Sequence, residues 1–172
     1  NVDSIGEACF FSCKSLNNIE VDEKNDNYEI SNGALIDKEN ECLFAYPMGC
    51  TETDYFVPEG ITRIGRDAFH ECENLENVIL PESLVEIGEG AFSYCRGLKS
   101  VEVPLGVQYI LEDTFAGCVA LDYVTIPDTV ISIDSFAFSG CDELKELYLP
   151  KSVNAISSYA FDDDLTLLVE QY

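Results

Sequence analysis

Residues Ile61–Cys72 read "ITRIGRDAFHEC", and Leu84–Cys95 read "LVEIGEGAFSYC" after a shift of 23 positions. In both stretches an isoleucine is followed by an alanine four positions later and a phenylalanine five positions later. A cysteine closes each stretch, eight positions after the isoleucine. A nearly identical motif at a fixed stride indicates a repeat protein in which each unit has the same structure.

The motif continues on both sides at the same stride. The marking isoleucines, 23 residues apart, are Ile64, Ile87, Ile110, Ile133 and Ile156. Their phenylalanines are Phe69, Phe92, Phe115, Phe138 and Phe161. Cysteines stand at offset eight, as Cys72, Cys95, Cys118 and Cys141, and leucines at offset eleven, as Leu75, Leu98, Leu121, Leu144 and Leu167. Apolar residues at offsets fourteen and sixteen precede a proline in four of the units.

Each unit is predicted to form one turn of a solenoid. In "NLENVILP" the alternating apolar residues are typical of a short strand, and the proline ends it. Stacked turns would place these strands in a parallel sheet about 4.8 Å apart. The "IGEGAFSYC" half is too short for a long helix, so we expect one or two turns of α or 3₁₀ helix there. The expected fold class is therefore an α/β repeat solenoid, coiled right-handed, with columns of identical side chains in its core.

The repeating unit "LxxVxIPxxVxxIGxxAFxxC" resembles the BspA-like, or treponemal-type, leucine-rich repeat of bacterial surface proteins. The N-terminal stretch keeps the same offsets with Ile5, Phe10 and Cys13, and Cys9 takes the small-residue position. The resemblance implies a cell-surface or extracellular location and, for the class, adhesion to host or partner proteins.

One unit is irregular, because 36 residues rather than 23 separate Val21 from Val57. The segment resembles a hairpin-bearing unit that recurs in the same family. From the residues alone, "GALID" and "CLFAYP" are two apolar strands around the polar turn 38–40, and "YFVP" rejoins the repeat at Val57. We expect a β-rich insertion that projects from one helical half-turn or replaces it.

The predicted organisation is one solenoid domain over residues 1–172. It comprises a partial repeat at 1–21, the hairpin-bearing repeat at 22–60, regular repeats at 61–155 and a truncated repeat at 156–172. The last unit has Asp164 in the cysteine position and Glu170 where an apolar strand residue belongs. Because solenoid ends need polar caps, we expect the chain to be a piece of a longer array.

The eight cysteines raise the question of disulfides or metal. Equivalent cysteines of stacked turns would point the same way about 4.8 Å apart, whereas a disulfide needs Cβ atoms about 3.8 Å apart. A straight row of thiols also cannot surround a tetrahedral zinc. We expect buried free thiols, Cys9 and Cys13 included, and no metal. A Cys42–Cys50 disulfide in the irregular segment stays open.

Composition and motifs argue against several functions. The 33 acidic and 9 basic residues give a net charge of −24, which disfavours nucleic acids and anionic lipid. No apolar run reaches the roughly 18 residues of a membrane span. The single histidine, His70, is expected to face solvent without a paired nucleophile, and the run 162–164 indicates a solvated turn. We expect a monomer with no enzymatic activity and no cofactor.

The remaining candidate is the outer face of the strands, at offsets twelve, thirteen and fifteen. Tyr123 and Tyr148 would lie roughly 8 Å apart on adjacent strands, with Thr125 and Ile79 on the same face. Exposed tyrosine is a common anchor at protein interfaces. One hypothesis is a module that binds a host or matrix protein, or alternatively a glycan, through Ile79, Tyr123, Thr125 and Tyr148. The other is a rigid spacer that holds another domain away from the cell.

Overall fold

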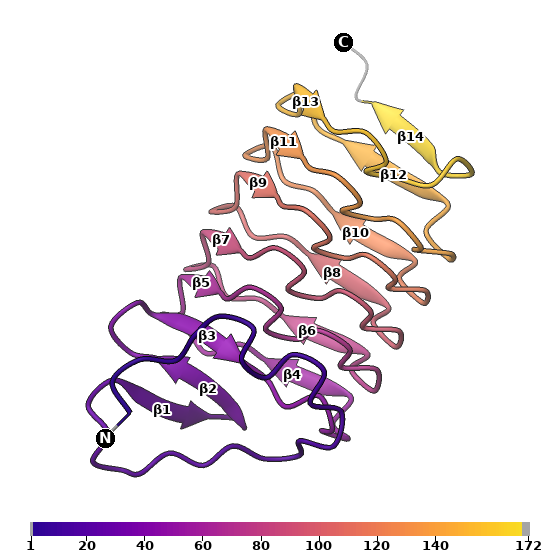
Figure 1. The fold of residues 1–172 in the computed structure, drawn as a ribbon. Coiled ribbons are helices and arrows are strands. Elements are labelled where there is room, and N and C mark those ends of the chain that lie inside the picture. Colours follow the sequence, from indigo (N-terminus) through magenta and orange to yellow (C-terminus); the bar gives the residue numbers. More distant parts are fainter. Residues whose placement is uncertain (1, 170–172) are drawn as a thin grey trace.

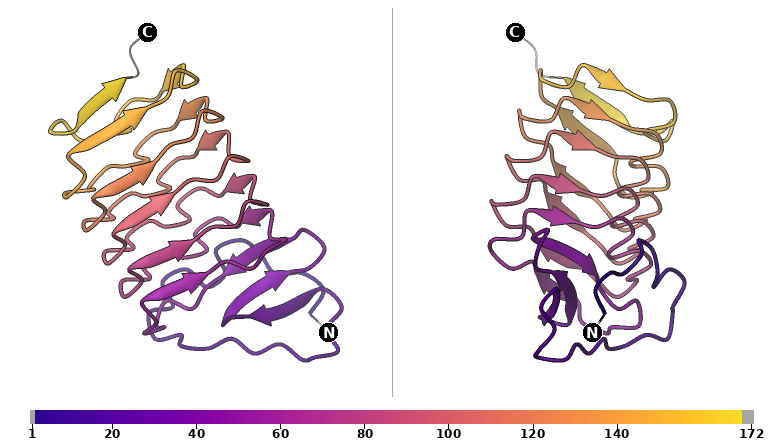
Figure 2. Two further views of the ribbon diagram at one scale, coloured as in Figure 1. Left: turned by 180° about the vertical axis from the view of Figure 1, so that it is seen from behind. Right: turned by 60° about the vertical axis from the view of Figure 1, so that its left-hand side comes forward.

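In the computed structural model, which describes residues 2–169, successive turns of chain stack along one axis with the two termini at opposite ends (Figure 1). Parallel strands line two sides of the stack, and the described residues contain no helix. Figure 2 shows the longer strands on one side of the stack and the short strands on another. The solenoid is therefore confirmed, and the helical half-turns of the prediction are wrong.

The first sheet is formed by the predicted strands, which pair in parallel and in register, as with Val78 of β6 opposite Tyr55 of β4. Its strands are β4 Asp54–Phe56, β6 Asn77–Ile79, β8 Ser100–Glu102, β10 Tyr123–Thr125, β12 Glu146–Leu149 and β14 Thr166–Val169. Strand pairing runs from β4 to β10 and again from β12 to β14, with no pairing between β10 and β12. The middle residue of β6, β8 and β10 is buried and the third is exposed. The apolar alternation in the sequence thus identified the core-facing side chains correctly.

A second parallel ladder of two-residue strands, each ending at a marking isoleucine, was not predicted. These strands are β5 Arg63–Ile64, β7 Glu86–Ile87, β9 Tyr109–Ile110, β11 Ser132–Ile133 and β13 Ala155–Ile156. Strand pairing joins β5 to β7 and β9 through β11 to β13, with no pairing between β7 and β9. Pairs such as Ile64 with Ile87 and Ile110 with Ile133 align the isoleucines across turns. Two residues per turn are too few for an alternation pattern, so the sequence carries no strand signal at this place.

Consecutive β-turns replace the expected helical half-turns. In the second regular unit Cys95 N donates to Phe92 O at 3.1 Å, while Phe92 N donates to Thr114 O of the next turn at 2.9 Å. Positive φ angles recur three residues after each isoleucine and seven residues after each except Ile156, as at Asp67 (54°) and Glu71 (55°). A helix cannot contain such residues without breaking its i to i−4 ladder. The backbone therefore hydrogen-bonds between turns, which explains why the helix prediction failed.

The phenylalanines form the predicted column through the core. Consecutive rings from Phe69 to Phe161 are stacked with centroids 5.1, 5.7, 5.3 and 5.6 Å apart. Tyr46 extends the column at its N-terminal end, with its ring 5.3 Å from that of Phe69. Its amide donates to Ala68 O at 2.7 Å, the same bond that the phenylalanines from Phe69 to Phe138 make to the following turn.

The cysteine column is buried as predicted, and all eight cysteines are free thiols, so the open question of a Cys42–Cys50 disulfide is answered in the negative. The thiols of Cys95, Cys118 and Cys141 donate to phenylalanine carbonyls of the preceding turn at 3.0–3.2 Å. The prediction was wrong for Cys9 and Cys13, which are exposed.

The exposure of Cys9 and Cys13 follows from the packing of the N-terminal stretch. Ala8 and Ser12 have the positive φ angles of the regular turns, 53° and 60°, so the local turn shape is retained. Yet Phe10 packs against a small separate cluster around Tyr28 rather than in the phenylalanine column. The first turn is therefore shaped like the others, but its phenylalanine does not join the column and its cysteines stay outside the core.

The irregular segment holds the predicted antiparallel hairpin, β2 Ala34–Asp37 with β3 Cys42–Ala45, and an additional strand, β1 Tyr28–Ser31. β3 pairs in parallel with β5, so the hairpin replaces a half-turn and extends the second sheet. The β1–β2 turn also covers the edge of the first sheet, because Asn32 Nδ2 donates to Phe56 O at 3.3 Å.

The last turn reaches its strand three residues early. Leu167 pairs with Leu147 of β12, a separation of 20 residues instead of 23, so Leu167 does not take the predicted leucine position. Leu165 packs against the core there, and Asp164 forms an exposed ion pair with Lys145 at 2.8 Å. The polar run 162–164 shortens the turn and so shifts the register. Glu170 lies outside the described residues.

Candidate functional site

The outer face of the first sheet carries the predicted binding residues. Ile79, Tyr123 and Tyr148 are 56%, 56% and 67% exposed, and Thr125 is exposed beside them. All four lie on neighbouring strands from β6 to β12 and point away from the core. Their exposure matches the prediction, while a binding role for them stays a prediction.

Sequence reasoning missed one residue of this face, Phe56, which is 62% exposed and lies opposite Ile79 in the register. The irregular length of the second repeat concealed it. The signal was nevertheless present, because Val57 and Pro58 mark the end of a strand and place Phe56 in the same column as Ile79 and Tyr148. The face therefore carries apolar or aromatic side chains at both ends, Phe56–Ile79 and Tyr123–Tyr148.

Of the described charged groups around these side chains, the lysines are paired and some of the carboxylates are not. Both lysines of the face are paired, Lys99 with Glu76 and Lys145 with Asp164. Asp54 accepts hydrogen bonds from Thr53 and Asn77, which hold the pKa of its carboxyl below the ordinary value.

Three other carboxylates of the face have no partner among the described residues. The exposed side chains of Glu102, Asp122 and Glu146 make no hydrogen bond or ion pair within residues 2–169.

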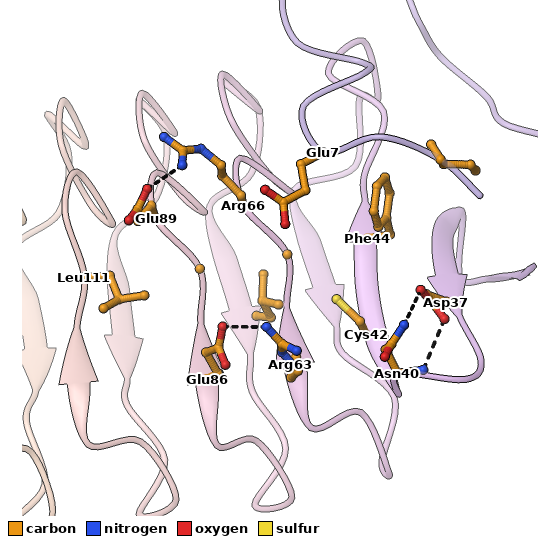
Figure 3. A pocket seen from close by; sticks show the side chains of 14 residues that line it. Glu7, Asp37, Asn40, Cys42, Phe44, Arg63, Arg66, Glu86, Glu89 and Leu111 are labelled. Atoms are coloured by element: carbon orange, nitrogen blue, oxygen red, sulfur yellow. Dashed lines mark hydrogen bonds and ion pairs between the residues drawn. The ribbon is translucent and has the colours of Figure 1, made fainter.

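A second candidate surface is an open hollow of about 420 Å³ outside the second sheet, between the N-terminal segment and the hairpin (Figure 3). Arg63 pairs with Glu86 at 2.8 Å and Arg66 with Glu89 at 2.6 Å on its wall. Glu7 reaches in from the N-terminal segment.

The chemical groups of the hollow offer little reactivity. Burial raises the pKa of the Cys42 thiol to about 11, so this thiol is protonated and a poor nucleophile at neutral pH. Because both arginines are already neutralised, the hollow offers little to an anionic ligand.

His70 lies in a different setting from the one predicted. It is half-buried, stacked on Phe11 with ring centroids 4.5 Å apart, and its Nδ1 lies 2.5 Å from the Ser93 hydroxyl oxygen. The expectation that His70 faces solvent was therefore wrong, and a serine hydroxyl that the sequence did not indicate lies beside it. Ser93 is 3% exposed and donates its proton to Gly90 O at 2.8 Å, so the hydroxyl accepts from His70. Burial lowers the pKa of His70. A buried serine whose proton is held by a carbonyl is a structural group rather than a nucleophile.

Three exposed aromatic residues, Tyr94, Phe136 and Tyr159, occupy positive-φ positions on the turn edge. Such backbone costs a non-glycine residue about 1–2 kcal/mol. Phe136 and Tyr159 stack with centroids 5.6 Å apart, and the Tyr94 ring lies over Gly117, where a Cβ atom would approach it to 2.6 Å. These contacts offset the backbone strain. Tyr94 and Phe136 therefore have a structural role in packing one turn against the next.

Within residues 2–169 no group of three or more histidine, cysteine or acidic side chains is arranged to hold a metal ion. Over the same residues the structure has no helix long and apolar enough to cross a membrane.

Comparison with known proteins identifies the family. The model of the BspA-type leucine-rich repeat region matches residues 1–44 and 40–167, in six copies. The chain belongs to the BspA-type leucine-rich repeat family. Its repeats are thus those of the family that the sequence resembles. Repeats of this family occur in surface proteins, and nothing in the match points to catalysis or nucleic-acid binding.

Solved structures give the same fold. A leucine-rich cell surface protein from Faecalibacterium prausnitzii is 29% identical over 86% of this chain and 41% of its own length, with a TM-score of 0.78. A leucine-rich repeat protein from Eubacterium ventriosum is 22% identical over 99% of this chain and 58% of its own (TM-score 0.60). The pneumococcal vaccine antigen PcpA is 20% identical over 90% and 50% (TM-score 0.65). The BspA-type chain therefore spans about half the length of these relatives. A comparison with curated proteins found no match.

Proposed function

We propose that this BspA-type repeat is a protein-binding module of a secreted or cell-surface bacterial protein. Its partner, a host or matrix protein, would dock on the outer face of β4–β12. One observation carries the proposal: on an otherwise polar sheet, Phe56, Ile79, Tyr123 and Tyr148 are each more than half exposed. Folding gains nothing from these exposed apolar groups, whereas aromatic anchors contribute strongly at interfaces.

The rigid backbone supports the same function. The face consists of short strands held in parallel register, with β8 paired to both β6 and β10 and β12 paired to β14. Side chains on such strands lose little conformational freedom on binding, which lowers the cost of association. The location of the relative from F. prausnitzii at the cell surface fits a role in adhesion.

The test replaces Tyr123 and Tyr148 with serine and measures binding to immobilised matrix proteins and mucin. Tyr109→Ser is the matched control, because Tyr109 is 49% exposed but lies on the second sheet. We expect the double variant to lose at least about tenfold in affinity, since hot-spot aromatics contribute about 2 kcal/mol or more. Equal binding by the double variant and the native domain would remove this face from consideration. No binding by the native domain would favour the spacer.

A further inference from the structure

Glu146 lies between the two exposed tyrosines of the first sheet. It is on the same face of β12 as Tyr148, two residues away, which is about 7 Å along a strand. The 23-residue stride places it at the same repeat position as Tyr123 of β10, the strand of the preceding turn, which lies beside β12 without strand pairing (Figure 1). Tyr123, Glu146 and Tyr148 are all exposed, so two aromatic rings flank one carboxylate in open solvent.

No cationic side chain of the described residues neutralises the Glu146 carboxylate. Lys145 is adjacent to Glu146 in sequence, yet its ammonium group is bound to Asp164 at 2.8 Å. Lys99, the other lysine of the face, is bound to Glu76. The face therefore presents carboxylates without a partner, while both of its ammonium groups are already engaged, and an approaching anionic surface would be repelled.

We propose that the sheet face binds an arginine or lysine side chain of its partner between Tyr123 and Tyr148, against the Glu146 carboxylate. Either side chain has an apolar stem that packs on an aromatic ring and a cationic end that is attracted both to the ring and to a carboxylate. The partner surface is accordingly cationic. This inference rests on the proposed function and specifies the chemistry of the partner.

The test uses a peptide of Gly-Arg-Ser repeats and an otherwise identical peptide in which neutral citrulline replaces each arginine. Binding to the native domain is measured by titration followed by NMR. Glu146→Gln is compared with Glu39→Gln, a matched change at an exposed residue of the β2–β3 turn. The two variants have the same net charge, so they separate a local site from the diffuse attraction of a chain with net charge −24.

We expect the arginine peptide to bind more tightly than the citrulline peptide and to shift the resonances of Tyr123 and Tyr148. Glu146→Gln should weaken its binding by about twofold to fivefold, and Glu39→Gln should leave it unchanged. The inference is overturned if both variants weaken binding equally, or if the citrulline peptide binds as well as the arginine peptide. Circular dichroism of each variant confirms that the fold is intact.

Failure of this inference can be distinguished from failure of the proposed function. If the native domain binds a matrix protein through Tyr123 and Tyr148 but does not prefer the arginine peptide, the function stands and the cationic partner is wrong. If the arginine peptide binds in a Glu146-dependent way while no protein does, the site is correct and the adhesive function is wrong.

Discussion

At the scale of single residues, the interior phenylalanines hold the turns together. Phe92 is completely buried, with the rings of Phe69 and Phe115 stacked 5.1 and 5.7 Å on either side. Stacked aromatic rings add to the hydrophobic stabilisation of burial. The position of each ring is fixed twice, by this stacking and by the amide bond to the following turn, so a ring cannot move to fill a neighbouring void.

Phe92→Ala should lower the free energy of unfolding by about 3–5 kcal/mol, because it leaves a cavity in a rigid column. Phe161→Ala should cost clearly less, since Phe161 is only partly buried and stacks on Phe138 alone. Urea denaturation of both variants measures the two costs. Equal losses would mean that the column does not carry the stability of the core.

Most residues of the candidate face could be predicted from the sequence, and two features of it could not. Tyr123, Tyr148, Thr125 and Ile79 were predictable, because their offsets in the repeat fix which way they point. Phe56 was missed because it follows a unit of irregular length. The ion pair of Lys145 with Asp164 could not be predicted, because it depends on the shift of the last strand by three residues. The repeat pattern of the sequence gives no sign of this shift.

At the scale of elements, the strands were predictable and the turns were not. Apolar alternation before a proline marks a strand in any context, and the family hairpin was readable from two apolar runs. In contrast, "IGEGAFSYC" has no feature that separates a short helix from a chain of β-turns. Hydrogen bonding to the next turn, as from Phe92 N to Thr114 O, selects the β-turns over a helix. This is a tertiary interaction, which the local sequence does not reveal.

The cysteine column predicts a loss of stability at alkaline pH. Burial raises the pKa of Cys141 from an ordinary value of 9.0 to about 12, and the pKa values of Cys95 and Cys118 well above 9.0. Above pH 9 the unfolded chain releases these protons and the folded chain keeps them. The stabilisation is therefore complete below pH 9 and falls as the pH rises above 9, up to about pH 12 for Cys141, at up to about 1.4 kcal/mol per thiol per pH unit.

Denaturation by urea at several pH values checks this expectation. Cys118→Ala should make the fall of stability with pH shallower, because it removes one buried titrating group. Cys13→Ser is the control, since Cys13 is exposed, and should leave the slope unchanged. A slope that is the same in all three proteins would show that the thiols are not responsible.

At the scale of the whole molecule, the two ends of the stack differ. The N-terminal end of the first sheet is covered, because Ser31 O accepts a hydrogen bond from the Tyr55 hydroxyl at 3.1 Å. At the other end, Ile156 and Val169 are 46% and 62% exposed on the last described turn. Between these ends the regular turns repeat the stacking of phenylalanine rings from Phe69 to Phe138, so stability should be nearly a sum over turns.

The central claim is that turns of 23 residues stack in register. Removing residues 88–110, one complete turn, tests it most directly when compared with removing residues 90–110, which breaks the register by two positions. We predict that the first deletion still unfolds cooperatively in urea, with a smaller dependence on denaturant concentration, and that the second does not fold. If both deletions fold equally well, or if neither folds, the stacked 23-residue turn is not the unit of this structure.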